Sequence, residues 1–116
     1  VEGGKLTSSL ETVRKGEELE LTFALEGYSD IEKGICALKG TLVLEPDIFT
    51  GVSQEDFETV NSWEKLFYNP DNGQFVLIRR DGSRQAEEVF RLRLTAGEDI
   101  PAGEVAVSVQ GLSLSE

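Results

Sequence analysis

The chain has 116 residues, which is enough for one domain to bury a core without disulfide bonds. Its formal net charge of −11 excludes nucleic-acid backbones and anionic membrane surfaces as expected partners, because like charges repel. The single cysteine excludes an intrachain disulfide, and the lack of histidine removes the commonest general base and zinc ligand. We expect a single domain spanning residues 1–116.

An apolar period of two, with no sustained helical repeat, runs through the first part of the chain. Residues 18–25 alternate strictly between apolar and polar types, which predicts a strand with one buried face, and an earlier strand is expected over residues 5–9. Residues 34–44 continue this pattern, with Gly40 facing inward beneath a bulky neighbour. Cys36 lies in the same apolar run and is expected to be a reduced, buried, small hydrophobe.

Pro46 interrupts the apolar pattern, and proline lacks the backbone donor that the interior of a strand ladder requires. We therefore expect the chain to turn a corner there and to form a short strand over residues 48–52. The spacing of Ser53 and Asp56 fits a capping box, which predicts one helical turn.

Turn-forming residues separate the predicted strands in the second half of the chain. The sequence PDNG at residues 70–73 favours a tight hairpin, so residues 65–69 and 74–80 should pair antiparallel. Residues 89–94 alternate strictly, and a last strand is expected over residues 105–114, bent at a glycine. About nine short strands predict an all-β fold, a two-sheet antiparallel sandwich. Its expected core residues include Phe23, Leu42, Phe90 and Leu92.

Three segments resemble the cohesin family. VRKGEELELTFALEG (13–27) is similar to the family's opening strand, GICALKGTLVLEPDIF (34–49) to its central strand and corner, and VFRLRLTAGEDIPAGEVAVSV (89–109) to its late strand, loop and final strand. Cohesins are jelly-roll modules of bacterial scaffoldins and surface proteins that bind dockerins. The resemblance implies a jelly-roll topology, a protein partner, and an extracellular or cell-surface location. It also implies that the proline corner carries the chain from one sheet to the other.

The resemblance places the dockerin-binding surface on a sheet that would contain residues 34–44, 74–80 and 89–95. At two central-strand positions where some cohesins carry Asn and Asp, this chain has Ala37 and Lys39, so the charge is reversed. A basic stripe is therefore expected to bind an acidic partner. An alternative is that these charges are gatekeepers on a solvated sheet, paired with neighbouring acids. The candidate partner-binding residues are Ala37, Lys39, Thr41, Arg79, Arg91 and Arg93.

Two other non-catalytic functions stay open. A carbohydrate-binding module would need exposed, coplanar aromatic rings, and Trp63, Phe67 and Tyr68 form the only cluster in the sequence that could supply them. Their spacing favours a role in covering one end of the core. A structural spacer of a surface protein would have a polar exterior without an apolar patch.

Catalysis and metal binding find little support in the residue pattern. Adjacent acidic residues such as Glu87 and Glu88 point to opposite faces of a strand, which favours solvated charge over a catalytic dyad. Calcium could bind among carboxylate and amide groups, but no segment has the ligand spacing of an EF-hand loop. We expect no enzyme activity, no cofactor and no required metal. The residues considered for calcium are Asp30, Glu32, Asp71 and Asn72.

Membrane insertion is not expected either. No apolar stretch approaches the roughly 20 residues of a membrane-spanning helix, and the first residues, VEGG, do not resemble a signal peptide.

Overall fold

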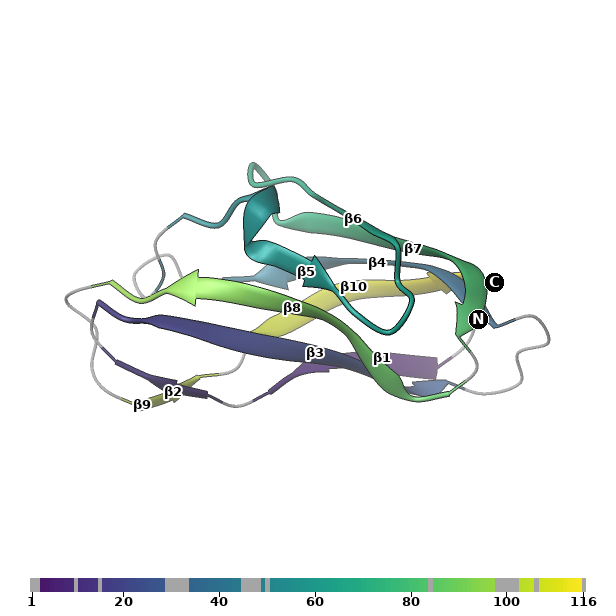
Figure 1. Ribbon diagram of the computed structural model, residues 1–116, viewed down its shortest axis with the longest axis horizontal. Coiled ribbons are helices and arrows are strands. Elements are labelled where there is room, and N and C mark those ends of the chain that lie inside the picture. Colours follow the sequence, from purple (N-terminus) through teal and green to yellow (C-terminus); the bar gives the residue numbers. More distant parts are fainter. Residues whose placement is uncertain are drawn as a thin grey trace.

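The computed structural model describes residues 3–9, 11–14, 16–28, 34–44, 49, 51–83, 85–97, 103–105 and 107–115. Most of this part of the chain is β structure. Two four-stranded antiparallel sheets lie one above the other in Figure 1 and enclose the core. The predicted all-β, two-sheet antiparallel sandwich of about nine strands is confirmed.

The first sheet has the strand order β1-β3-β8-β5, and the second has the order β10-β4-β7-β6. The strands of the first sheet are β1 (Gly3–Ser8), β3 (Glu18–Tyr28), β8 (Glu87–Thr95) and β5 (Phe57–Thr59). Those of the second sheet are β10 (Ser108–Ser115), β4 (Ile35–Val43), β7 (Gln74–Ser83) and β6 (Lys65–Tyr68). A separate two-stranded ladder joins β2 (Glu11–Val13) and β9 (Gly103–Val105).

The core forms where the alternating apolar residues of the two sheets meet. Phe23 and Phe90 face each other across β3 and β8, with stacked rings whose centroids are 4.5 Å apart. Phe75 of the second sheet lies 5.5 Å from the Phe90 ring and joins the two layers. The four core residues predicted from the sequence, Phe23, Leu42, Phe90 and Leu92, are all buried, which confirms the assigned strand phases.

After β4 of the second sheet, the next described pairing of the chain is with the first sheet. Phe49 forms an isolated antiparallel bridge with Ala96, which follows β8 of the first sheet. Pro46 itself lies outside the described residues. The strand predicted over residues 48–52 is wrong for the described part of that segment, because only the Phe49 bridge forms there and buried Val52 is not in a strand.

The helical turn predicted at Ser53 is present as a single turn of 3₁₀ helix, η1 (Gln54–Asp56). The Asp56 carboxylate accepts a hydrogen bond from the Ser53 backbone N at 2.9 Å, as a capping box requires. This turn places Gln54 beside β6, an edge strand of the second sheet. The Gln54 side chain donates to the Leu66 carbonyl and accepts from the Tyr68 backbone N at 2.7 Å.

The hairpin predicted at residues 70–73 is confirmed, because β6 and β7 pair antiparallel across it. Gly73 has a φ of 77° and donates its backbone N–H to the Asn69 carbonyl at 2.9 Å. A Cβ atom there would come within 2.9 Å of the Leu42 carbonyl oxygen, so the turn also packs closely against β4. Glycine meets both demands.

The end of the chain departs from its predicted form. The single strand expected over residues 105–114 is two strands, because β9 ends at Val105 and pairs with β2 while β10 pairs with β4. The predicted bend is present, since the β10 register shifts between Gln110 and Ser113 and Gly111 between them has a φ of 63°.

Gly40 faces the core as predicted, because a Cβ atom there would lie 2.8 Å from Val109 and 3.3 Å from the Phe75 ring. Cys36, in contrast, is half-buried rather than buried. The pairing of β4 with β7 shifts between Ile35 and Ala37, so the simple alternation on which the prediction relied is broken at the cysteine.

Replacing Phe90 with alanine should lower the free energy of unfolding by about 3–5 kcal/mol, because it leaves a cavity at the centre of the aromatic core. Denaturant unfolding would measure the loss. The matched control is Phe67→Ala, which removes a ring that is 57% exposed and should change stability by about 0.5 kcal/mol or less. Equal losses in the two variants would contradict the assigned core.

Burial raises the pKa of the Tyr68 phenol above its ordinary value of 10.0. The folded protein therefore holds this proton more tightly than the unfolded chain does. The stability that depends on Tyr68 should be complete below about pH 10 and lost as the pH rises through the folded-state pKa. Unfolding measured between about pH 8 and pH 11 should show this alkaline decline in the parent and a weaker one in Tyr68→Phe. An identical decline in both proteins would refute the assignment.

Candidate functional site

The outer face of the second sheet is the surface that points away from the core. Its outward positions follow from the register, which sets Lys39 opposite Val76 across β4 and β7, and Val76 opposite Phe67 across β7 and β6. On the other side, Ser113 of β10 lies opposite Lys39. Neighbouring outward residues therefore form rows that cross all four strands.

Exposed apolar side chains gather on this face. In the described part of the chain, four large hydrophobic residues are exposed, and all four are outward residues of the second sheet. Phe67 and Val76 are direct cross-strand neighbours, and Ile78 is the next outward residue along β7. An apolar cluster on a regular strand surface is a typical mark of an interaction site. The four residues are Val43, Phe67, Val76 and Ile78.

The charge of this face is opposite to that of the whole chain. Lys65 lies opposite Ile78, Lys39 lies opposite Val76, and exposed Arg80 follows two residues after Ile78. Among the described residues of β4, β6, β7 and β10, the one Asp or Glu is Asp81, which is exposed near the end of β7, directly after Arg80. A chain of net charge −11 thus has a face that combines apolar and basic groups.

The structure brings three of the predicted partner-binding residues together. Ala37, Lys39 and Thr41 are successive outward residues of β4, next to Ile78, Val76 and Gln74 of β7 respectively. Lys39 is exposed, and Ala37 and Thr41 are half-buried.

Arg91 and Arg93 do not belong to this face. They lie on β8, which pairs with β3 and β5 in the first sheet, so the prediction that residues 89–95 share a sheet with residues 34–44 is wrong. Arg93 lies opposite Glu20, and Arg91 lies opposite Glu58. The prediction of a single basic stripe is therefore wrong. The alternative, in which the charges lie beside acidic residues on a solvated sheet, describes Arg91 and Arg93.

Arg79 also turns away from the outer face, into a partly buried cluster at one end of the sandwich. Its guanidinium forms an ion pair with Glu87 at 2.6 Å, and the two side chains are only 10% and 15% exposed. It lies 5.4 Å over the Trp63 ring, whose Nε1 donates to the same Glu87 carboxylate at 3.1 Å. Its remaining hydrogen bonds go to the Asn61 and Asp81 carbonyls. Arg79 is thus a structural residue.

The aromatic cluster weighed for sugar binding is divided between the core and the surface. Trp63 is 3% exposed and covers one end of the core, as predicted. Tyr68 packs against Phe57 with ring centroids 4.7 Å apart, while Phe67 points outward from the same strand. The three rings therefore form no flat exposed platform.

Sequence reasoning missed five members of the site, which are Val43, Lys65, Phe67, Val76 and Ile78. A usable signal was present in residues 75–78, where four consecutive apolar residues occupy both phases of one strand. Only one phase can face the core, so the other must expose apolar side chains.

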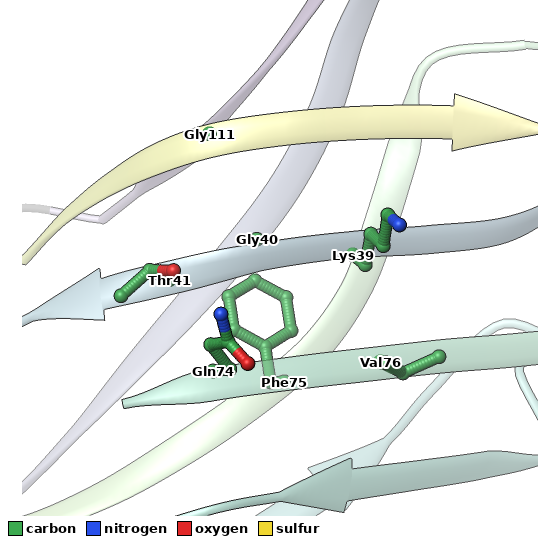
Figure 2. Close-up of a pocket in the computed structure, with 7 residues that line it drawn as sticks. All are labelled: Lys39, Gly40, Thr41, Gln74, Phe75, Val76 and Gly111. Carbon is green, nitrogen blue, oxygen red and sulfur yellow. The ribbon is translucent and has the colours of Figure 1, made fainter. Parts of the chain in front are cut away.

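A depression of about 190 Å³ opens on the outer face between β10, β4 and β7 (Figure 2). Lys39 and Val76 lie toward one end of it, and Thr41 and Gln74 lie toward the other. Its lining contains no carboxylate.

Metal ligands do not gather in the described residues, where no group of three or more Cys, Asp or Glu side chains is placed to hold a metal ion. Asp30 and Glu32, two of the residues considered for calcium, lie outside the described part. Asp71 and Asn72 are exposed hairpin residues that hydrogen-bond within their own turn. Within the same described residues, no helix has the length and apolar character needed to span a membrane.

Comparison with protein-family models gives no match for this chain, and comparison with curated protein sequences gives none.

Arg79→Met should lower the free energy of unfolding by about 1–3 kcal/mol, because it leaves the Glu87 carboxylate partly buried without its cation. The neighbouring Arg80→Met, which removes an exposed cation, should change it by about 0.5 kcal/mol or less. Adding Glu87→Gln to Arg79→Met should recover part of the loss. Chemical denaturation of the three variants would check this, and similar effects of Arg79→Met and Arg80→Met would be evidence against the cluster.

Proposed function

We propose that this chain is a non-catalytic protein-binding module of cohesin type, which docks a dockerin-like partner on the outer face of its second sheet. One observation carries the proposal. The exposed large hydrophobic residues of the described chain lie on one sheet face, together with the cations Lys39, Lys65 and Arg80, and the described strands of that sheet carry a single acidic residue, Asp81. The resemblance of three segments to cohesins supplies the class of partner.

The composition of the face defines the chemistry of the partner. Phe67, Val76 and Ile78 would be desolvated against apolar side chains, which favours association in proportion to the area removed from water. The surrounding cations would attract a partner with acidic groups at its rim and repel a basic one. Since the chain as a whole is strongly acidic, an acidic partner is favoured in the orientation that meets this face.

The same observation separates this function from the alternatives. A structural spacer has no use for an apolar cluster on an otherwise polar exterior. A carbohydrate-binding module needs stacked aromatic rings, but Phe67 is the only exposed ring among Trp63, Phe67 and Tyr68. Protein docking uses the apolar and the basic groups together.

The face is also suited to docking without rearrangement. Its two central strands, β4 and β7, carry Leu38 and Leu77 into the core, and both are fully buried. Because the outward side chains alternate with these anchored residues, their positions are set by the core. Such a surface favours rigid-body association. As the resemblance implies, the module would act outside the cell or at its surface, within a larger multimodular protein.

The test is binding to a panel of purified dockerin modules, measured by surface plasmon resonance. Replacing both Phe67 and Val76 with serine should lower the affinity for any dockerin that binds the parent by at least about tenfold, because the variant loses the centre of the apolar cluster. The melting temperature should change little, because both side chains are exposed. The association rate of the parent should fall as salt rises.

The matched control is Arg91→Gln with Arg93→Gln, which removes two cations from the outer face of the first sheet. This variant should bind the same dockerin as the parent does. If the arginine variant loses binding and the serine variant keeps it, the interface lies on the first sheet and the proposal is contradicted. A panel with no binding member would refute the cohesin-type function.

A further inference from the structure

The depression in Figure 2 lies within the outer face, at the point where the β10 ladder is irregular. Its walls are side chains of β4 and β7, and its floor is the backbone around Gly40 and Phe75. Gly111 closes it on the β10 side, within the register shift between Gln110 and Ser113. The inference drawn from it rests on the proposed function, because it concerns the same face.

The depression is open on its β10 side because Gly111 carries no side chain. Gly111 has a φ of 63°, and a Cβ atom built there meets no atom within 4 Å, so the space above it is open. Gly40 directs its missing side chain toward Val109 and Phe75 in the core rather than outward. A partner side chain could therefore reach the sheet backbone here.

Hydrogen-bond donors surround this space. The Gln74 side-chain oxygen accepts from Asn72 Nδ2 at 3.3 Å, and in Figure 2 its amide nitrogen points toward β4. The Thr41 hydroxyl points along β4 toward Gly40 in the same view. In Figure 2 the exposed Lys39 ammonium points away from Gly40 and Thr41, and its flexible stem allows it to turn over the depression. The described lining thus offers a cation, a hydroxyl and an amide donor.

We propose that the depression is the anchor site for a carboxylate side chain, an aspartate or glutamate, of the docked protein. A carboxylate accepts several hydrogen bonds, and those donated by an ammonium are the strong, charge-assisted kind. The methylene groups of the acid would contact Val76, the apolar wall of the depression. A neutral amide would lose the ion pair with Lys39, and a basic side chain would be repelled by it.

This anchor would fix the register of the docked partner on an otherwise repetitive sheet. The apolar cluster of Phe67, Val76 and Ile78 attracts apolar surface without strong directional preference. A single acid bound beside Lys39 selects one placement of the partner among those that the apolar contacts allow.

The experiment is an NMR titration of the ¹⁵N-labelled chain with N-acetyl-aspartate methylamide, matched against N-acetyl-asparagine methylamide. The aspartate probe should shift the backbone amides of Lys39, Thr41, Gln74 and Gly111, and the asparagine probe should bind at least about fivefold more weakly. Lys39→Gln should weaken binding of the aspartate probe by a similar factor. Arg80→Gln removes an equal charge from the same face outside the depression and should change binding by less than about twofold.

Equal binding of the two probes, equal effects of Lys39→Gln and Arg80→Gln, or no shifts at the depression would each overturn the anchor site. The outcome is separable from that of the proposed function. A dockerin that binds through Phe67 and Val76 with no dependence on Lys39 would overturn the anchor alone. If the aspartate probe alone shifts these amides and the chain binds no dockerin, the anchor site is supported and the cohesin-type function is refuted.

Discussion

The contact between the two sheets through Phe23, Phe90 and Phe75 is the constraint on which the rest of the structure depends. Once Phe75 and Leu77 face this core, the pleat of β7 forces Val76 and Ile78 outward. The apolar character of the outer face is therefore a geometric result of core packing combined with an apolar residue in every position from 75 to 78. A polar residue at the outward positions would have left the core unchanged. Their apolar identity is what calls for a functional explanation.

The phases of the strands were predictable, but the sheet to which each strand belongs was not. Strict alternation placed Phe23, Leu42, Phe90 and Leu92 inside because period two depends only on local sequence. The same alternation placed Arg91 outward correctly but could not say on which side of the sandwich. That choice is made by hydrogen bonding of β8 to β3 and β5, through contacts distant in sequence. The candidate site was thus half predictable: the residues of β4 were found, and those attributed to β8 belong to the opposite surface.

Local irregularities account for the other departures. Cys36 lies where the β4 register shifts, so the alternation that predicted burial does not hold across it. Arg79 follows the exposed Ile78 and carries a charge, which made a surface role reasonable, but Glu87 and Trp63 from distant segments enclose it. Because β7 and β8 belong to different sheets, this cluster also ties the two layers together beside the turn that connects them. No periodic signal in the sequence marks such a long-range ion pair.

The hydrogen bonds of Gln54 have a consequence for the mode of recognition. Many sheet proteins bind peptides by strand addition, in which the unpaired backbone groups of an edge strand accept another strand. At β6 the carboxamide of Gln54 already occupies the carbonyl of Leu66 and the N–H of Tyr68, much as a neighbouring strand would. At this edge, recognition of the apolar face through its side chains is therefore favoured over strand addition. An incoming strand would have to displace Gln54 from these two groups, which disfavours pairing of β6 with copies of the module.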